Sequence, residues 1–382
     1  MKLAIPKESR PDETRVAATP ETVKKLIDLG FEVTVEKGAG TASSIPDAQF
    51  KEAGAKIAKD AATALGDADV VLKVLRPTTG DGGEVGLMKS GAVLAAIMNP
   101  IADRETVDAC AAQGLQAFAM ELMPRITRAQ SMDVLSSQSN LAGYRAVIDG
   151  AYEFGRAFPM MMTAAGTVAP ARIVVMGAGV AGLQAIATAR RLGAVVSAFD
   201  VRPVAKEQVE SLGAKFIEVE SPETAGAETA GGYAKEMSEE YQAKQREVIH
   251  ETLKKSDIVI TTALIPGKPA PLLVTKETVA EMRPGSVIVD LASEAGGNCE
   301  LTEHGKIVTR GGVKIVGHAN VPGRLASNAS ALYAKNLLNF VTLMVDKEKQ
   351  ELAIDWEDEI ITGTALTRDG KVVHPALTGE GE

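Results

Sequence analysis

The chain has 382 residues and a formal net charge of −9 at pH 7, with 45% hydrophobic and 24% charged residues. This composition is ordinary for a globular protein with ample material for a core, and the length predicts one to three domains. The balance is acidic and the sequence contains no basic block, so nucleic acid is not an expected partner.

Two cysteines, Cys110 and Cys299, stand far apart and without neighbouring metal-ligand residues. A disulfide framework or a metal site is therefore not expected, and a reducing compartment is favoured. The opening MKLAIPKESRP lacks the apolar core of a signal peptide, and no apolar run reaches the roughly 18 residues that span a bilayer. We expect a chain that does not cross a membrane by itself.

The first third of the chain alternates strand-like and helix-like segments. The helix-like stretch TPETVKKLIDLG begins at Thr19, a suitable N-cap, and ends at Gly30, a stop signal. This strand–helix–strand rhythm predicts a parallel sheet with right-handed crossovers. Its strands are expected at Lys2 to Pro6, Phe31 to Gly38, Asp67 to Pro77, Gly91 to Met98 and Gln116 to Leu122.

A second series of the same kind begins at ARIVVMGAGVAG, after a helix that is expected from Ser137 to Phe158 and that bridges two domains. From Ala329 to about Val345 the chain is helical again, and we expect this helix to pack on the first domain. The pair Asp369-Gly370 is a hairpin turn signal. The second series has six expected strands: Ile173 to Met176, Val195 to Asp200, Ala214 to Val219, Ser256 to Leu264, Gly285 to Ala292 and Val313 to Gly317.

The predicted fold is therefore α/β, with two Rossmann-like doubly wound domains joined by long helices and a cleft between them. We place the first domain at residues 1–125 plus about 328–382, and the second at residues 137–327. The segment from Ser221 to Gln245 is rich in Gly and Ala and has no strand pattern. It lies where a plain Rossmann unit needs only a short connection.

The second domain opens with a pattern that fits a dinucleotide-binding fingerprint. The run GAGVAG, residues 177 to 182, matches G-x-G-x-x-G, follows an apolar strand and precedes a helix whose N-terminus offers free N–H groups to phosphates. The first glycine permits the tight turn, the second lets the backbone approach the pyrophosphate, and the third lets the helix pack on the strand. A structural glycine turn without a ligand is the alternative. The expected contacts are Gly177, Gly179, Val180, Ala181 and Gly182.

Asp200 ends the next strand, about 20 residues later, where the fingerprint places an acid that binds the adenosine ribose. A carboxylate there repels a 2′-phosphate, so the expected ligand is NAD(H) rather than NADP(H). Arg202 complicates this expectation because an arginine could accept a phosphate, but Asp200 holds the strand-end position. Val201, between the two, is also expected to contact the nucleotide.

The stretch PRITRAQSMD, residues 124 to 133, holds two arginines, a glutamine and an aspartate between a strand and the long helix. The carboxamide of nicotinamide needs a donor and an acceptor, which Arg125, Gln130 and Asp133 supply at the expected cleft. Ser136 and Asn140 continue the polar face by one helical turn. A solvated loop with an Arg–Asp pair is the alternative.

The run from MELMPRITRAQSMD through GAGVAGLQAIATARRLGAVVSAFDVR resembles the NAD(H)-binding component of proton-translocating nicotinamide nucleotide transhydrogenase. The likeness covers essentially the whole chain, from KLAIPKESRPDETRVAATP through TTALIPGKPAP to VHPALTG. It implies NAD(P)⁺ transhydrogenase activity of the proton-translocating type. A hydride would pass directly from NADH bound here to NADP⁺ on a partner subunit, without an acid or base in this chain.

The resemblance also implies site residues. Arg125, Gln130 and Asp133 become catalytic residues that meet the nicotinamide and the facing subunit. The segment ETAGGYAKEM, Glu228 to Met237, becomes a mobile lid over the bound nucleotide, with a surface loop as the alternative. The further implied contacts are Ile126, Thr127, Ser136, Gly232, Tyr233 at the tip of the lid, Gln245 and Leu264.

The resemblance implies partners as well. The chain is expected to be a homodimer that docks on an NADP(H)-binding subunit and on membrane-spanning subunits encoded elsewhere. It would then be cytoplasmic and peripheral on the inner face of the cell membrane, while proton translocation occurs in the membrane subunits.

The alternative enzyme is an alanine-dehydrogenase-like amino-acid dehydrogenase. This chain also resembles that family, which shares the two-domain fold and uses a lysine to bind the keto acid and a histidine for proton transfer. Lys73 is retained here, but Met98 and Asn99 stand where the histidine would be wanted. The four histidines are expected outside the first domain, so imine reduction lacks its general acid. We interpret Lys73 as a relic or a structural residue and His318 as structural, and we assign no chemistry to Glu294. An NAD(H)-sensing binding module is the non-enzymatic alternative.

Overall fold

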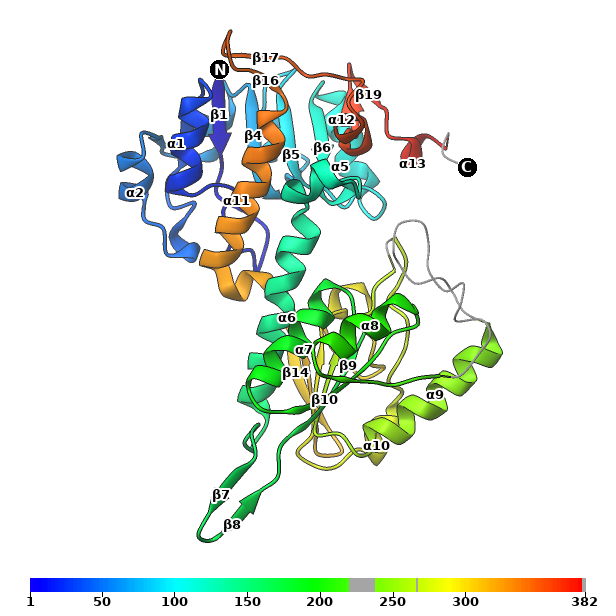
Figure 1. Ribbon diagram of the computed structural model, residues 1–382. Helices are drawn as coiled ribbons and strands as arrows, with labels where there is room; N and C mark the ends of the chain where they lie inside the picture. The colour runs from blue at the N-terminus through cyan, green and yellow to red at the C-terminus, as the bar shows by residue number, and fades with distance from the viewer. Residues whose placement is uncertain (220–237, 266, 380–382) are drawn as a thin grey trace. The chain divides into compact units, whose positions relative to one another are not determined.

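The computed structural model describes residues 1–219, 238–265 and 267–379, and the chain divides into two compact units (Figure 1). Unit 1 comprises Met1–Gln138 and Gly323–Glu382, and unit 2 comprises Ser139–Pro322. The boundary falls inside helix α6, Val134–Glu153, which contains most of the predicted bridging helix. The prediction of a cleft between the two domains stays a prediction.

Unit 1 is built on a parallel sheet of six strands in the order β3-β2-β1-β4-β5-β6. This is a doubly wound order whose direction reverses between β1 and β4. The short edge strand β3 has no counterpart in the sequence analysis, and the other five strands are confirmed. The strands are β1 Lys2–Ile5, β2 Glu32–Glu36, β3 Lys56–Ala58, β4 Val70–Leu75, β5 Val93–Ile97 and β6 Gln116–Ala119.

Both faces of this sheet are buried, which explains why its strands are almost continuously apolar. Leu3 and Ile5 point into one core, with α1 and α11, while Ala4 between them points into the other, with α3 and α5. The predicted return of the late helix to the first domain is confirmed by α11. The helices of unit 1 are α1 Pro20–Asp28, α2 Asp47–Glu52, α3 Ala61–Leu65, α4 Glu84–Leu87, α5 Arg104–Ala112, α11 Ala326–Thr342, α12 Glu359–Thr364 and α13 Pro375–Thr378.

Unit 2 is built on a sheet of seven strands in the order β11-β10-β9-β12-β13-β15-β14. The six predicted strands are all present and run parallel. The seventh, β14, was missed because it pairs antiparallel with β15 at the edge of the sheet and its side chains are mostly exposed. The strands are β9 Arg172–Met176, β10 Val195–Phe199, β11 Lys215–Phe216, β12 Ile258–Thr261, β13 Val287–Asp290, β14 Lys306–Arg310 and β15 Val313–Gly317.

Alternate residues of β9 again serve two cores. Ile173 and Val175 pack with α6, α7 and α8, whereas Val174 and Met176 pack with α9 and α10. The Gly- and Ala-rich segment ends in α9, and its residues 221–237 lie outside the described residues. The helices of unit 2 beyond α6 are α7 Val180–Arg191, α8 Val204–Ser211, α9 Glu239–Leu253 and α10 Lys276–Glu281.

The bridging helix differs from its prediction at both ends. It begins three residues earlier, because Asp133 caps its first turn by accepting from the backbone N–H of Ser136. It ends at Glu153 rather than Phe158, and the next residues enter an unpredicted hairpin of β7, Met161–Thr163, and β8, Gly166–Val168. Figure 1 shows this hairpin projecting beyond the rest of unit 2.

The C-terminal part of unit 1 contains two short antiparallel hairpins. The predicted turn at Asp369-Gly370 is confirmed, because both residues have positive φ, 51° and 74°, and join β18 Thr367–Arg368 to β19 Lys371–Val372. The hairpin of β16 Val345–Asp346 and β17 Glu351–Leu352 was not predicted. Across the described ranges, each helix is too short or too polar to be a candidate membrane span.

Candidate functional site

The carboxyl ends of β9 and β12 form the point where strand order reverses in unit 2. Open α/β sheets bind ligands outside such a point. Here β9 leads into Gly177 and β12 into Thr262. The hydroxyl of Thr262 donates to the carbonyl of Gly177 over 3.0 Å, which ties the two strand ends together. The predicted glycine loop therefore starts at the position where a dinucleotide would be expected.

The three glycines of this loop differ in what the backbone demands of them. Gly177 has φ +97°, and a Cβ on Gly182 would lie 1.8 Å from the carbonyl oxygen of Gly177, so a side chain is excluded at both positions. A Cβ on Gly179 would meet no atom of the described residues within 4 Å. Nothing in the described part of the chain requires glycine at Gly179, and the space beside it is open for a ligand.

Helix α7 begins directly after this loop, with Gly179 as its N-cap and no side chain capping it. The first N–H groups of a helix lack intrahelical acceptors and carry partial positive charge. Val180, the first residue of the helix, is 42% exposed, and Ala181 is half-buried. An uncapped N-terminus beside an open glycine can hold a phosphate.

Asp200 follows β10 as predicted, but its carboxylate is already occupied. One oxygen accepts from the backbone N–H and the Nε of Arg202, both at 2.9 Å. The other accepts from the backbone N–H of Ala178 at 2.7 Å and from Nη2 of Arg202 at 2.8 Å. These four bonds use all the acceptor positions of a carboxylate. A ribose hydroxyl could bond to Asp200 only if the Arg202 side chain moved away. The role of Asp200, and that of half-buried Val201, stays a prediction.

The remaining predicted nucleotide contacts of unit 2 differ in their solvent exposure. Leu264 is 48% exposed and follows β12, whereas Gln245 is buried within α9. Asn298, which the sequence analysis missed, donates to the carbonyls of Ala263 and Pro271 and accepts from the N–H of Ala263. It thereby fixes the backbone on which Leu264 stands. Gly232 and Tyr233 lie outside the described residues.

In unit 1 the polar loop forms a 3₁₀ helix, η3, over Thr127–Met132. Such a helix has three residues per turn, so residues three apart share a face. Ile126, Ala129 and Met132 pack into the core of unit 1. Thr127 and Gln130 are exposed on a second face, which half-buried Asp133 continues. The three-residue spacing I-x-x-A-x-x-M in the sequence indicates this buried face of the 3₁₀ helix.

The other predicted residues in and after this loop differ in their contacts. The carboxylate of Asp133 accepts from the backbone N–H of Ser136 at 2.9 Å and from its hydroxyl at 2.6 Å, which caps α6. Arg125 is exposed next to the 3₁₀ helix. Asn140, a turn beyond Ser136, donates to Gln184 of α7 over 3.3 Å.

Arg128, which was not predicted as a site residue, pairs with Asp358, the N-cap of α12, through bonds of 2.6 and 2.8 Å. The hydrogen bonds from Arg128 lower the pKa of Asp358 below its ordinary value. The pair anchors the third face of the 3₁₀ helix.

Lys73 lies in the second half of β4, two residues before the strand ends at Leu75, and is fully buried. Its Nζ is 2.8 Å from a carboxylate oxygen of Glu84 and 3.3 Å from one of Glu8. Burial alone would lower the pKa of Lys73, but Glu8 and Glu84 outweigh it and raise the pKa. Burial raises the pKa of Glu8. The lysine is bound by carboxylates on two sides, which favours the second of the two interpretations, a relic or a structural residue.

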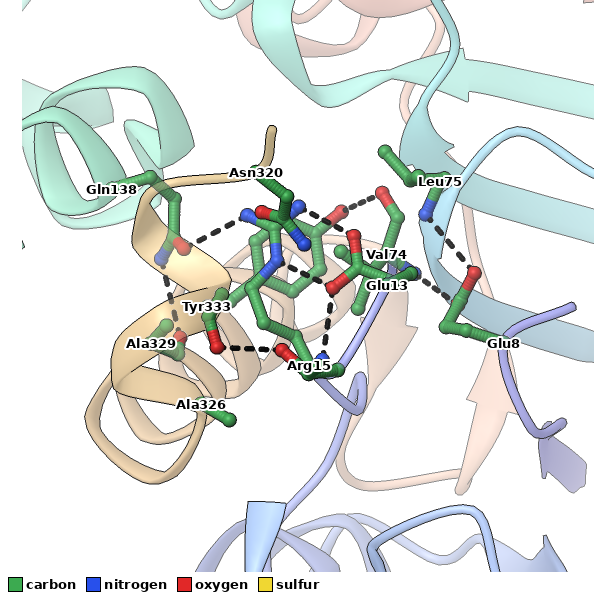
Figure 2. A network of polar contacts seen from close by, with 12 residues as sticks. Glu8, Glu13, Arg15, Val74, Leu75, Gln138, Asn320, Ala326, Ala329 and Tyr333 are labelled. Atoms are coloured by element: carbon green, nitrogen blue, oxygen red, sulfur yellow. Dashed lines mark hydrogen bonds and ion pairs between the residues drawn. The ribbon is translucent and has the colours of Figure 1, made fainter. Parts of the chain in front are cut away.

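Arg15 forms a second buried contact group, which the sequence analysis did not single out. Its guanidinium binds both carboxylate oxygens of Glu13, at 2.8 and 2.7 Å, and donates to Gln138 at 2.9 Å. Gln138 in turn donates to the carbonyl of Ala329 in α11. Figure 2 shows Arg15 between Glu13 and Gln138, and Glu8 against the backbone of Val74. Arg15 and Lys73 are thus both engaged by the chain itself.

The two residues that follow β5, Met98 and Asn99, have no titratable side chain and hence no imidazole. The backbone N–H groups of Met98 and Asn99 bind the carboxylate of Glu121. The prediction that all four histidines lie outside the first domain was wrong, because His374 belongs to unit 1. Its Nδ1 accepts from Ala376 as the cap of α13, and its Nε2 lies 3.2 Å from the carbonyl of Gly363.

The other residues set aside in the sequence analysis also have structural contacts. The carbonyl of His318 accepts from Ser293, and the carboxylate of Glu294 accepts from the N–H of Asn320. Cys110 and Cys299 are buried, and burial raises the pKa of Cys110 to about 12 and that of Cys299 to about 11. These thiols are unreactive at neutral pH, as their predicted packing role requires.

These features define a class of protein: two Rossmann-like α/β units, one with a dinucleotide fingerprint at its switch point. Family models narrow the class. The N-terminal domain of alanine dehydrogenase/PNT matches residues 4–142, and the C-terminal domain of alanine dehydrogenase/PNT matches residues 146–375. The chain belongs to this family.

Individual relatives point in the same direction. The chain is 65% identical over 383 residues to the first portion of the NAD(P) transhydrogenase alpha subunit of Rhodospirillum rubrum, with 100% of both chains covered. A transhydrogenase structure from Sinorhizobium meliloti superposes with a TM-score of 0.84 at 56% identity, covering 98% of this chain and 100% of that one. An alanine dehydrogenase of Mycolicibacterium smegmatis is 30% identical, and the match covers 99% of this chain and 96% of that protein.

Proposed function

We propose that this chain is the NAD(H)-binding subunit of a proton-translocating transhydrogenase. The observation that carries the proposal is the full-length likeness, at 65% identity, to a transhydrogenase alpha subunit. More than twice as many positions are shared with that subunit as with the alanine dehydrogenase at 30% identity. The open glycine loop and uncapped α7 support dinucleotide binding in unit 2.

In this proposal the reaction is direct hydride transfer from NADH, bound here, to NADP⁺ carried by a partner subunit. The task of this chain is to orient the nicotinamide, since reacting atoms must approach to about 3–3.5 Å. Arg125, Gln130 and Asp133 would hold the ring, with Ile126, Thr127 and Ser136 beside them. A hydride moves without a proton, so this step needs no general acid or base.

The proposed cofactor of this chain is NAD(H), with NADP(H) on the partner. Gly177, Gly179 and Gly182 would admit the pyrophosphate, and Asp200 would bind the ribose after the displacement of Arg202. Gln245 and Leu264 would complete the site from the second βαβ half.

We further propose that the chain is a homodimer that lies on the inner face of the cell membrane through its partner subunits. The β7–β8 hairpin supports association, because Met160, Met161 and Met162 are 60%, 42% and 78% exposed. A two-stranded hairpin with such residues is marginally stable in water unless another surface covers it. Sedimentation of Met162→Asp should show monomer at concentrations where the unaltered chain is dimeric, and an unchanged dimer would place the interface elsewhere.

The alanine dehydrogenase alternative is disfavoured by two observations. Lys73 is buried and bound by two carboxylates, so a keto acid would have to displace them. The residues at the end of β5 offer no imidazole. An NAD(H)-sensing module remains the non-enzymatic alternative, and the assay below separates it from the proposal.

The test reconstitutes the chain with an NADP(H)-binding subunit and follows reduction of an NADP⁺ analogue by NADH. Turnover well above that of either protein alone is expected. A lack of turnover in the presence of normal NADH binding would favour the sensing module. Oxidation of NADH by pyruvate and ammonia would instead support the dehydrogenase.

A further inference from the structure

The backbone of the 3₁₀ helix is held at one carbonyl by two amides from a distant helix. Asn336 and Asn339 of α11 both donate through Nδ2 to the carbonyl oxygen of Ser131, at 2.8 and 3.1 Å. Ser131 stands directly between Gln130 and Met132, so the bonded carbonyl lies within the segment that carries Gln130 and Asp133.

One of these amides also reaches the next element. The Oδ1 of Asn336 accepts from the hydroxyl of Ser137 in α6 at 2.8 Å, and Asn336 is only 7% exposed. A single buried side chain therefore ties the end of the 3₁₀ helix to the first turn of α6. Asp133 lies between these two attachment points and caps the same turn.

This arrangement has features that packing alone does not require. The core face of the 3₁₀ helix is already anchored by Ile126, Ala129 and Met132. Those apolar contacts and the Arg128–Asp358 pair hold two faces of the helix. They leave the exact angle about its axis less sharply defined, because apolar burial is not directional. Two directional hydrogen bonds on the Ser131 carbonyl narrow the remaining rotation, which would turn Gln130 away from the proposed nicotinamide position.

We propose that Asn336 and Asn339 are positioning residues for hydride transfer: they hold the Ser131 carbonyl and so fix the orientation of the Gln130–Asp133 face. They contact neither nucleotide in this scheme and act through the loop. The inference rests on the proposed function for its catalytic consequence, but the clamp itself is a property of unit 1.

The test compares the unaltered chain with Asn336→Leu, Asn339→Leu and the double variant. Asn328→Leu is the matched control, because Asn328 is exposed on the first turn of the same helix. The double variant should slow single-turnover transfer to an NADP⁺ analogue on the partner subunit by about tenfold or more, since small misplacements of reacting groups have large costs. Its dissociation constant for NADH should stay within about twofold of normal. Asn339→Gln, which keeps the donor, should recover part of the rate.

A second readout follows the loop without catalysis. Amide hydrogen exchange at residues 127–133 should accelerate in the double variant and not in Asn328→Leu. Unchanged exchange, unchanged transfer, or transfer and NADH affinity that fall by the same factor would each overturn the inference. If the double variant does not fold, the single change at half-buried Asn339, Asn339→Leu, decides by the same criteria. An inactive unaltered complex would count against the proposed function, and the exchange result would still decide whether the clamp exists.

Discussion

The two sheets share one winding order, but the residues at the carboxyl ends of their central strands differ. Those of unit 2 form a glycine loop, and those of unit 1 form a buried ion-pair cluster. At the switch point of unit 2 the strand ends lead into a glycine loop, and a Cβ on its middle glycine would meet no described atom of the chain within 4 Å. At the corresponding edge of unit 1, Lys73 is closed in by Glu8 and Glu84. The comparison teaches that strand order places a site but does not open it, since function depends on the side chains that stand at the strand ends.

The largest expected effect tests whether the edge of unit 1 is a closed structural cluster. Lys73→Met should destabilise the protein by about 3–5 kcal/mol, because it leaves buried carboxylates without their cation. Denaturant unfolding measures this loss. The combined variant with Glu8→Gln and Glu84→Gln should recover most of it. Should Lys73→Met be as stable as the unaltered chain, the cluster would not be a structural unit, and an open binding role at this edge would have to be reconsidered.

The next effect tests whether the edge of unit 2 is an open ligand site. Gly182→Ala should weaken NADH binding about 100-fold, or about 2.7 kcal/mol, because its Cβ would force α7 away from Gly177. Gly179→Ala is the sharper comparison. It should keep the thermal midpoint of the unaltered protein, since its Cβ meets no described atom of the chain, and should still weaken NADH binding. Normal NADH affinity in Gly179→Ala would mean that the pyrophosphate does not pass there.

A third variant tests the acid beside that loop. Asp200→Ala should weaken NADH binding by roughly 1.5–3 kcal/mol, the contribution of a hydrogen bond to a charged group. The change also frees Arg202 from this carboxylate, so the preference for NADH over NADPH should shrink. Glu207→Ala, which removes an exposed acid of α8, controls for net charge. Calorimetric titration of both nucleotides decides the matter, and unchanged affinity for both would place the ribose elsewhere.

The smallest effect concerns the Arg128–Asp358 pair, a more exposed ion pair of unit 1 than the Lys73 cluster. Arg128 lowers the pKa of Asp358 below 3.8, so the pair stabilises the fold above that pH and the contribution is lost as the pH falls through the lowered pKa. Asp358→Asn should therefore lower the thermal midpoint at pH 7 by only about 2 °C. The difference from the unaltered chain should shrink steadily as the pH is lowered below 3.8. Because asparagine caps a helix about as well as aspartate, a difference that persists in acid would show that the Arg128–Asp358 ion pair is not its cause.

The sequence predicted most of the fold for reasons that are local. Apolar runs such as Val70–Leu75 are buried on both faces, and such runs are typical of strands in parallel sheets. The glycine spacing after β9 and the acid after β10 follow from short-range geometry in the same way. Strand β14 was missed because an exposed antiparallel edge strand carries no continuous apolar signal.

The candidate site was predicted less completely, because its side chains have partners that spacing alone does not reveal. Asp200 was expected to be free for a ribose, and nothing in its spacing indicated that Arg202 would bind both of its oxygens. Asp133 was expected to face a nicotinamide, and its role as the cap of α6 became visible only with the helix boundary. Gly232 and Tyr233 remain predictions.

By itself, the sequence determined two α/β units built on parallel strands, a dinucleotide fingerprint and a polar loop. These features follow from hydrophobic periodicity, turn chemistry and residue spacing, which act over a few residues. Only the tertiary structure decided which charged and amide groups meet. Lys73 met Glu84 across 11 residues, and Asn336 met the carbonyl of Ser131 across 205. Buried polar groups must find partners, and the chain finds them wherever folding brings donors and acceptors together.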